Sequence, residues 1–416
     1  MFLLLGYCFG TAALTWLLVG QLIRLAPRIG LLDRPNERSS HTRVTPRGGG
    51  IGFVLAIALA LGVRGLLGDG REAVPGARPS LAASQTSSDT GEAVALARSG
   101  TAAGTPLPRD GSAPLSAEPG SKRDSFHDVG VSLVPSTVVT AAQLYAVVAA
   151  ALFIAAISLR DDFKSLGAGL RFACHFAAAG VVVGTLGAFR AIDLPYGATW
   201  LLPGWLGTTL TIVWIVGLTN VYNFMDGIDG IAGGQGVAAG LGWLVAGLAF
   251  GAPTTAFLGA VLAVGCAGFL LHNWSPAKIF MGDVGSAFLG FLFAVVPLAA
   301  VTEVPDLAGL WPLFAGLVVW PFVGDGFLTF VRRLRKGEKV WEAHRSHLYQ
   351  RLTRCGWTHA RVSRLYLGWA GLTVSIAWLW STDFPGAAAC VIVLPPASLA
   401  ALFLYVSKRE RTNGAG

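Results

Sequence analysis

The chain has 416 residues, of which 53% are hydrophobic and only 13% are charged. This composition, with a mean hydropathy of +0.60, excludes an ordinary soluble domain and is typical of a membrane protein. The formal net charge is +8, but the basic residues lie in short loops between apolar runs, where they set orientation, so we expect no nucleic-acid partner. The five cysteines form no CxxC pair, so neither a disulfide framework nor a zinc site is expected.

Uncharged apolar runs that could span a bilayer, at roughly 20 residues each, occur about eleven times. We therefore predict an all-α polytopic membrane protein with about eleven transmembrane helices. The first run, 2–25, has no charge before it and is followed by Arg28. This predicts a retained first helix with the N-terminus outside, and a cytoplasmic C-terminus.

A composition shift divides the chain into three parts. Residues 1–67 hold the first two predicted helices and a cytoplasmic loop, and residues 138–416 hold the remaining helices and their polar loops. Between them, residues 68–137 are rich in Ala, Gly, Ser, Pro and Thr without helical or alternating periodicity. We predict that this segment is a disordered extracytoplasmic insert without a catalytic role.

The first cytoplasmic loop ends in the sequence Arg43-Val44-Thr45-Pro46-Arg47-Gly48-Gly49-Gly50. Backbone N–H groups at a glycine-rich helix start, with arginines nearby, predict a seat for a phosphate. A solvated positive-inside loop would explain the arginines equally well, but not the glycine triplet.

A second polar cluster, Arg160-Asp161-Asp162-Phe163-Lys164, follows the third apolar run on the same predicted side of the membrane. An isolated Asp-Asp pair flanked by bases is usually a salt-bridged helix end. Its place on the side that holds the other polar clusters makes it a candidate functional group as well.

The stretch from Asn220 to Gly230 ends an apolar run abruptly. Asn220, Asn223, Asp226 and Asp229 recur every third residue, so a continued helix would direct them toward one volume. The glycines at 227 and 230 would let a bulky anionic group or a hydrated metal approach the backbone. A polar helix end capped by Asn and Gly is the structural alternative.

Two further polar clusters lie on the same predicted side. In 273–286, Pro276 blocks a helix, Gly282 and Gly285 bracket Asp283, and Lys278 supplies a point charge suited to phosphate. The basic loop 332–361 contains His344-Arg345-Ser346-His347.

Carboxylates from three separate loops, with amides and no cysteine ligands, suit Mg²⁺, with Mn²⁺ as an alternative. The Lys, Arg and His side chains nearby suit phosphates. An acid-rich metal site ringed by bases at the cytoplasmic face is what phosphoryl transfer between a soluble nucleotide and a lipid phosphate requires.

Taken together, these motifs resemble the polyprenyl-phosphate N-acetylhexosamine-1-phosphate transferases of glycosyltransferase family 4. That family includes phospho-N-acetylmuramoyl-pentapeptide transferase and the initiators of O-antigen and common-antigen synthesis. The resemblance covers nearly all of the chain apart from the insert, and Asp33-Arg34-Pro35 fits the O-antigen branch. It implies transfer of an N-acetylaminosugar 1-phosphate from a UDP-sugar to undecaprenyl phosphate, with release of UMP. It also implies a location in the inner (plasma) membrane of a bacterium and contact with membrane lipid, and a homodimer is an open alternative.

The resemblance also implies roles for single residues. Asp283 would be the main Mg²⁺ ligand with Asn223 as a second, Asp161 a base toward the lipid phosphate, and Asp162 a group that positions metal or diphosphate. The remaining candidates are substrate-binding residues, with the uridine diphosphate or the sugar and phosphate as their targets: Arg43, Thr45, Lys164, Asn220, Asp226, Asp229, Lys278, His344, Arg345 and His347. GlcNAc is the expected sugar, with N-acetylfucosamine and N-acetylquinovosamine as alternatives.

Two other classes of protein are alternatives. A polytopic transporter or flippase would be about as hydrophobic, but it would place ionisable groups or broken helices near the bilayer midplane. A CDP-alcohol phosphotransferase would need an Asp-Gly-Ala-Arg pattern, which this chain lacks.

Overall fold

The structure is a computed structural model and describes residues 2–33, 35, 43–67, 138–339 and 345–412. The insert predicted at 68–137 and the candidate residue His344 lie outside these residues. All the elements described below belong to one unit, Met1–Gly68 with Leu133–Gly416.

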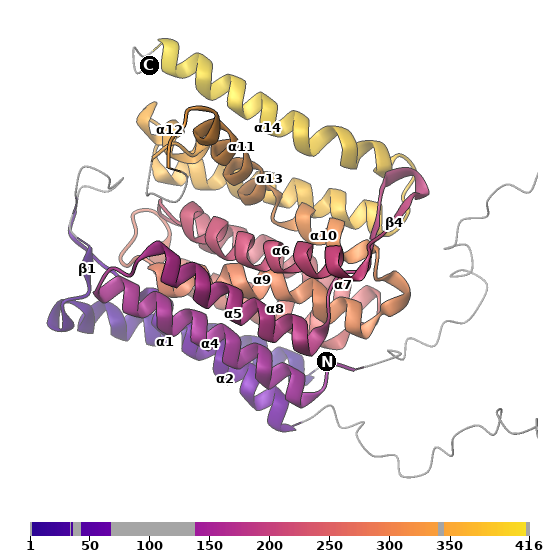
Figure 1. The fold of residues 1–416 in the computed structure, drawn as a ribbon. Coiled ribbons are helices and arrows are strands. Elements are labelled where there is room, and N and C mark those ends of the chain that lie inside the picture. The colour runs from indigo at the N-terminus through magenta and orange to yellow at the C-terminus, as the bar shows by residue number, and fades with distance from the viewer. Residues whose placement is uncertain (1, 34, 36–42, 68–137, 340–344, 413–416) are drawn as a thin grey trace, which may run out of the picture. The chain divides into compact units, whose positions relative to one another are not determined.

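Nearly all of the regular structure is helical (Figure 1). The helices are α1 Phe2–Ile29, α2 Gly49–Leu67, α4 Ala141–Phe163, α5 Ala168–Leu186, α6 Gly204–Met225, α7 Ile231–Ala249, α8 Pro253–Asn273, α9 Asp283–Glu303, α10 Leu310–Val318, α11 Trp320–Arg335, α12 Leu348–Arg354, α13 His359–Ser381 and α14 Ala387–Thr412. The strands are short and form two antiparallel pairs, β1 Leu32–Asp33 with β2 Thr45–Pro46, and β3 Ala191–Asp193 with β4 Thr199–Leu201.

The predicted class, an all-α polytopic membrane protein, is confirmed. Among the described residues, nine helices are long and apolar enough to cross a membrane, or ten if the bent pair α10–α11 is one span. The prediction of about eleven is reached only if α13 also crosses. This helix has 23 residues, enough for a bilayer at ~1.5 Å per residue, but its Ser, Thr, Gly and Trp residues lower its hydropathy.

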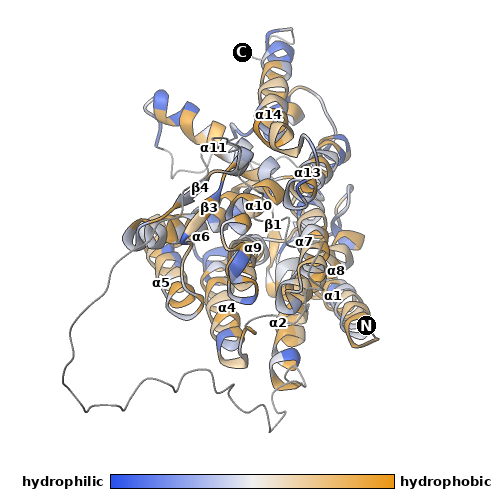
Figure 2. Cartoon of the chain, turned by 90° about the vertical axis from the view of Figure 1, so that its right-hand side faces the viewer, coloured by the Kyte–Doolittle hydropathy of each residue, from blue (hydrophilic) through white to orange (hydrophobic). Residues whose placement is uncertain are grey.

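Helix α9 is the centre of the bundle. In the 18-residue apolar stretch of α9, 94% of the residues are buried inside the protein, against 17% in the corresponding stretches of α1 and of α14. Figure 2 shows apolar residues on the outward faces of the surrounding helices as well, as expected where lipid is the solvent. Small residues bring α7 and α8 together, since a Cβ at Gly240 would lie 2.7 Å from the backbone nitrogen of Ala263.

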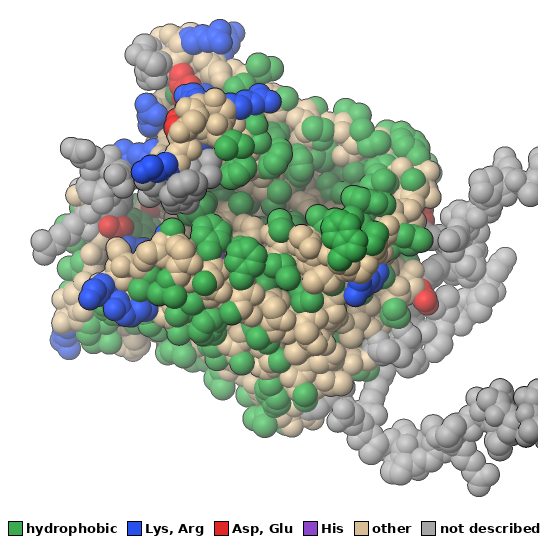
Figure 3. Space-filling model, viewed as in Figure 1, with side chains coloured by type: hydrophobic (Ala, Val, Ile, Leu, Met, Phe, Trp, Pro, Cys, Tyr) green, Lys and Arg blue, Asp and Glu red, His purple; other side chains and the backbone are tan. Residues whose placement is uncertain are grey.

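The two ends of the bundle differ in chemistry. At one end, the loops after α4, α6 and α8 meet the starts of α2 and α9, and Figure 3 shows most of the Lys and Arg on its viewed face gathered toward this end and α14. At the other end, the fully buried Glu303 accepts hydrogen bonds from the N–H groups of Thr254 and Thr255, at 2.7 and 2.9 Å. That carboxylate satisfies donors that the first turn of α8 leaves unpaired.

One span is broken. Helices α10 and α11 meet at an angle of 81°, and side-chain hydrogen bonds hold the residues on both sides of the break to other helices. The buried Gln235 donates its amide N–H to the carbonyl of Val318 at 2.8 Å. Trp320 donates its indole N–H to the carbonyl of Pro395 in α14 at 3.0 Å. The break is therefore a fixed feature of the packed bundle.

Candidate active site

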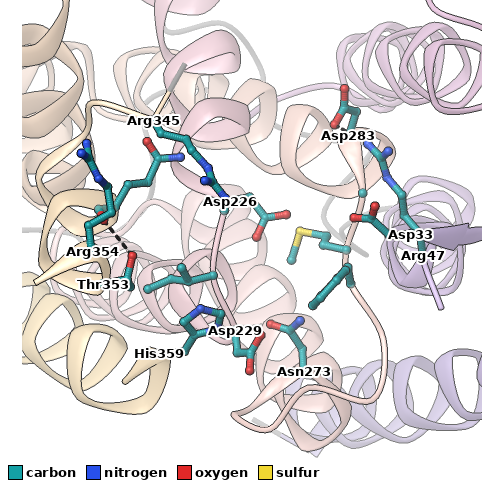
Figure 4. Close-up of a pocket in the computed structure, with 16 residues that line it drawn as sticks. Asp33, Arg47, Asp226, Asp229, Asn273, Asp283, Arg345, Thr353, Arg354 and His359 are labelled. Atoms are coloured by element: carbon teal, nitrogen blue, oxygen red, sulfur yellow. Dashed lines mark hydrogen bonds and ion pairs between the residues drawn. The ribbon is translucent and has the colours of Figure 1, made fainter. Parts of the chain in front are cut away.

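A cavity of about 490 Å³ lies at the polar end of the bundle (Figure 4). Residues from the first polar loop, from the stretch that ends α6, from the 273–286 cluster and from the basic loop with α12 and α13 line it. They are Asp33, Arg47, Asp226, Gly227, Ile228, Asp229, Asn273, Phe280, Met281, Gly282, Asp283, Arg345, Gln350, Thr353, Arg354 and His359. Of the predicted site residues, the structure brings Asp226, Asp229, Asp283 and Arg345 together on this cavity.

The glycine triplet serves close packing and not phosphate binding. The N–H groups of Gly49 and Gly50 donate to the carbonyls of Phe280 and Met281, at 2.9 and 2.8 Å. A Cβ on Gly50 would lie 2.5 Å from the backbone nitrogen of Gly285. The predicted phosphate seat at this helix start is therefore wrong, because these donors are already used. What the triplet does is bring Arg47 beside the start of α9.

Arg47 joins two carboxylates that are far apart in the sequence. Its guanidinium lies 2.5 Å from an oxygen of Asp162 and donates to Asp283 at 3.0 Å. Asp162 also accepts long hydrogen bonds, 3.4 and 3.5 Å, from the backbone N–H groups of Asp283 and Val284. The side chain of Asp162 is only 1% exposed, so it holds the first turn of α9 from inside the protein. Asp283 keeps part of its side chain exposed toward the cavity.

Asp226 ends α6 and lies between the two walls of the cavity in Figure 4. Burial and then the neighbouring Asp283 raise its pKa to about 7. Other carboxylates, led by that of Asp283, lie near the Asp226 carboxyl group, and Arg47 compensates only part of their negative charge. The cavity therefore has an excess of negative charge around Asp226 and Asp283 that a cation would stabilise.

The far end of the cavity is built around Asp229. Its carboxylate lies 3.1 Å from Nδ1 of His359 and accepts a hydrogen bond from the backbone N–H of Ala277 at 3.1 Å. Burial alone would raise its pKa, but the hydrogen bonds, led by that of His359, bring the pKa below the usual value. Asn273 completes this end, accepting from the N–H of Gly230 at 2.9 Å.

The wall opposite Asp283 is basic. Figure 4 shows Arg345 and Arg354 side by side there, with Asp33, Arg47 and Asp283 across the cavity. His347 does not share this position. It is buried, and its Nδ1 lies 3.4 Å from the carboxylate of Asp325 in α11, so the structure places it behind the wall and not on the cavity.

Several other predicted site residues do not line the cavity. Asp161 accepts from Arg171 at 2.8 Å and from the backbone N–H of Leu166, so both its oxygens hold the connection between α4 and α5. Asn220 donates to His175 at 3.0 Å and faces α5.

Asn223 donates its amide N–H to Ser286 at 3.0 Å and so ties α6 to α9. The remaining predicted residues off the cavity are exposed or lie in the β1–β2 pair: Lys164, Lys278, Arg43 and Thr45.

Other lining residues were missed from the sequence as site residues. Gln350, Thr353 and Arg354 have the i, i+3, i+4 spacing of one helix face, and that spacing could have found them. Asn273 begins the polar cluster 273–286, which was identified from the sequence, but Asn273 itself was not predicted to be a site residue. His359 follows Thr358, the N-cap of α13, and only its ion pair with Asp229, 130 residues earlier in the chain, reveals it.

The donor set can be compared with what Mg²⁺ requires. In the part of the chain that the structure describes, no three His, Cys, Asp or Glu side chains gather closely enough to hold a metal alone. Mg²⁺ commonly needs only one or two carboxylates, because water and substrate phosphates fill the other positions. Asp226 and Asp283, oxygen donors whose charge Arg47 compensates only in part, fit that requirement.

Comparison with known proteins finds relatives of this chain. Residues 144–301 match the model of glycosyl transferase family 4. The chain is 29% identical to the Bacillus subtilis "Probable undecaprenyl-phosphate N-acetylglucosaminyl 1-phosphate transferase" over 61% of its length and 70% of that protein. It is 29% identical to decaprenyl-phosphate N-acetylglucosaminephosphotransferase of Mycobacterium tuberculosis over 87% of its length and 78% of that protein.

A third relative is phospho-N-acetylmuramoyl-pentapeptide-transferase of a Synechococcus strain, 31% identical over 52% of this chain and 59% of that protein. The family match spans α4 to α9, the helices that carry Asp162, Asp226 and Asp283 to one end of the bundle. The chain is a multi-pass membrane protein and a glycosyl-1-phosphate transferase, and over these helices it is similar to glycosyl transferase family 4.

Proposed function

We propose that the protein transfers an N-acetylaminosugar 1-phosphate from a UDP-sugar to undecaprenyl phosphate. The observation that carries this proposal is the division of one cavity into an acidic wall, with Asp226 and Asp283, and a basic wall, with Arg345 and Arg354. A nucleotide diphosphate needs both a cation and basic side chains. By name, the relatives act on polyprenyl phosphates.

The two ends of the cavity suit different parts of such a donor. Arginines present paired N–H groups to phosphate oxygens, so Arg345 and Arg354 would hold the diphosphate. Asp229, His359 and Asn273 make the far end of the cavity polar and hold it in place through their bonds to one another's segments, and a polar uracil base would suit that end. Mg²⁺ bound by Asp226 and Asp283 would offset charge on the diphosphate.

The other substrate must come from the membrane. Helix α11 leaves the bundle at 81° to α10 and exposes Phe327, Phe330 and Leu334, with Phe327 65% exposed. The last turn of the same helix carries Arg332, Arg333 and Arg335. An apolar face that ends in arginines suits a polyprenyl chain with a phosphate head.

The reaction does not need a strong base. A phosphate oxygen of the lipid attacks the β-phosphorus of the UDP-sugar, the bond from that phosphorus to the bridging oxygen breaks, and UMP leaves with the electron pair. Because the second pKa of a phosphate monoester is about 6, the nucleophile is already largely dianionic at neutral pH. The protein therefore acts mainly by position and charge. The role of Asp161 as base stays a prediction, and its bonds to Arg171 and Leu166 favour a positioning role.

The remaining details belong to the same proposal. The sugar is GlcNAc, with N-acetylfucosamine and N-acetylquinovosamine as alternatives, and the product starts an O-antigen or another envelope polysaccharide. The cavity faces the cytoplasm, where UDP-sugars are made, with the C-terminus inside and the N-terminus outside. The basic residues of the polar end support this orientation.

The test is a reconstituted assay. Purified protein in vesicles with undecaprenyl phosphate and Mg²⁺ is given a panel of UDP-sugars, and both UMP and the lipid product are measured. We expect equal amounts of the two products, lost on chelation. Binding of UDP-sugars without UMP release, or movement of a sugar across the vesicle membrane, would instead support the transporter alternative.

A further inference from the structure

We propose that Asp325 is a positioning residue that sets the cavity wall formed by α12. This goes beyond the proposed function, on which it rests only for the identity of the substrate. Asp325 lies in α11, does not line the cavity and is 0% exposed. Its effect on the reaction would therefore be exerted through the helices that it bonds, chiefly α12.

The carboxylate of Asp325 collects donors from three helices. The backbone N–H groups of Leu348 and Tyr349, which open α12, donate to it at 2.8 and 3.3 Å. The hydroxyl of Tyr366 in α13 donates at 2.7 Å, and that of Thr329, one turn along α11, donates at 3.1 Å. Both oxygens therefore act as acceptors, and the two bonds to α12 fix where that helix begins.

Helix α12 presents the face with Gln350, Thr353 and Arg354 to the cavity. With only seven residues, it is too short to hold its own position, because isolated helices of fewer than about 12 residues are marginal. Its C-terminal half is fixed by Arg351, which donates to Glu410 in α14 at 2.8 and 2.6 Å. Asp325 holds the N-terminal half of α12 in the same way.

Tyr349, which Asp325 holds, also contacts the acidic wall. The hydroxyl of Tyr349 donates to the carbonyl of Phe224 at 3.0 Å, two residues before Asp226. A Cβ at Gly227 would collide with that hydroxyl, so the residue type at 227 permits the close approach. By holding Tyr349, Asp325 sets the separation between the α12 wall and the turn that carries Asp226.

The decisive variant is Asp325→Asn, which keeps the shape but turns one acceptor oxygen into an N–H₂ donor facing other donors. We expect the KM for the UDP-sugar to rise roughly tenfold or more, as for loss of hydrogen bonds to a charged group. The KM for undecaprenyl phosphate should change less than the KM for the UDP-sugar. Hydrogen exchange should become faster in residues 345–355 and stay unchanged in α9.

The matched control is Thr329→Val, which removes a hydrogen bond from the same carboxylate but none to α12. It should leave the KM for the UDP-sugar near the wild-type value. Tyr349→Phe, which removes only the bond to Phe224, should raise the same KM by a smaller factor. If Asp325→Asn does not fold, an unchanged KM in Tyr349→Phe would count against the proposed link from Asp325 to the acidic wall.

Two results would overturn the proposal. One is a folded Asp325→Asn protein with wild-type KM and wild-type exchange at 345–355. The other is an equal loss of kcat, both KM values and thermal stability in Asp325→Asn and Thr329→Val, as for a general packing defect. The exchange measurement needs no turnover, so an inactive wild-type protein would count against the proposed function and leave this inference to be decided by exchange.

Discussion

Asp283 is the residue whose charge matters most in the cavity. It begins α9, keeps about a third of its side chain exposed and is paired with Arg47. In Asp283→Asn, a neutral amide replaces the charge that would hold a divalent cation, and we expect kcat to fall roughly 100-fold or more. The measurement is UMP release across a Mg²⁺ titration. Asp306→Asn, at an exposed acid of the opposite end, is the control and should keep wild-type turnover.

Asp226 gives a prediction for stability against pH. Its pKa is about 7 in the folded protein and 3.8 is the ordinary value, so between these values the folded protein binds more protons than the unfolded chain. Its contribution to stability therefore falls as pH rises from about 4 to about 7 in chelator. Asp226→Asn should melt at least about 2 °C above wild type at pH 8, with no gain at pH 4. A constant difference across this range would show that the charge is not responsible.

Of the motif His344-Arg345-Ser346-His347, the described structure places Arg345 on the cavity. If it contacts the sugar, Arg345→Ala should change the ranking of UDP-sugars, because a site built to bond a hydroxyl rejects a sugar that lacks it. The measurement is relative kcat/KM for UDP-GlcNAc and the 6-deoxy UDP-sugars. An equal decrease for every sugar would assign Arg345 to the diphosphate alone.

At the scale of elements, the contact between α2 and α9 is set by backbone thickness. A Cβ at Gly50 would lie within 2.5–2.7 Å of the backbone of Gly285 and Met281, whereas a Cβ at Gly62 on the same helix meets nothing within 4 Å. Gly50→Ala should therefore push α2 away from the start of α9, lower the melting temperature and remove most activity. Gly62→Ala should be neutral or slightly stabilising, since alanine favours helix. Retained activity in Gly50→Ala would mean that the site tolerates this shift.

The same elements show where the sequence was informative. The apolar runs predicted the helices because a span must be long and apolar, and the acids at their ends predicted one polar end because charges avoid lipid. The use of the glycine triplet was not predictable, because it depends on which backbone lies opposite. Asn220 followed the same three-residue spacing as Asp226, but the helix ends at Met225, so the two side chains point to different neighbours.

For the whole molecule, α13 decides the topology. Eleven spans put the two termini on opposite sides of the membrane, and ten put them on the same side. We expect eleven, because α13 packs mainly against α7 and α10 and so needs less hydropathy than a lipid-facing helix. A C-terminal fluorescent fusion should be active in the cytoplasm, and an N-terminal epitope should be cleaved by protease added outside. If protease added outside cleaved neither terminus, both termini would lie in the cytoplasm and α13 would not be a membrane span.

The buried carboxylate at the other end of the bundle bears on how the protein is made. The N–H groups that open α8 have Glu303 as their acceptor, and Glu303 is the last residue of α9. During translation α8 leaves the ribosome first, so its opening turn would meet the membrane with unsatisfied donors. Leaving such groups in lipid is costly. We therefore expect α8 and α9 to enter the membrane together as a hairpin, with Glu303 crossing beside the turn that it caps.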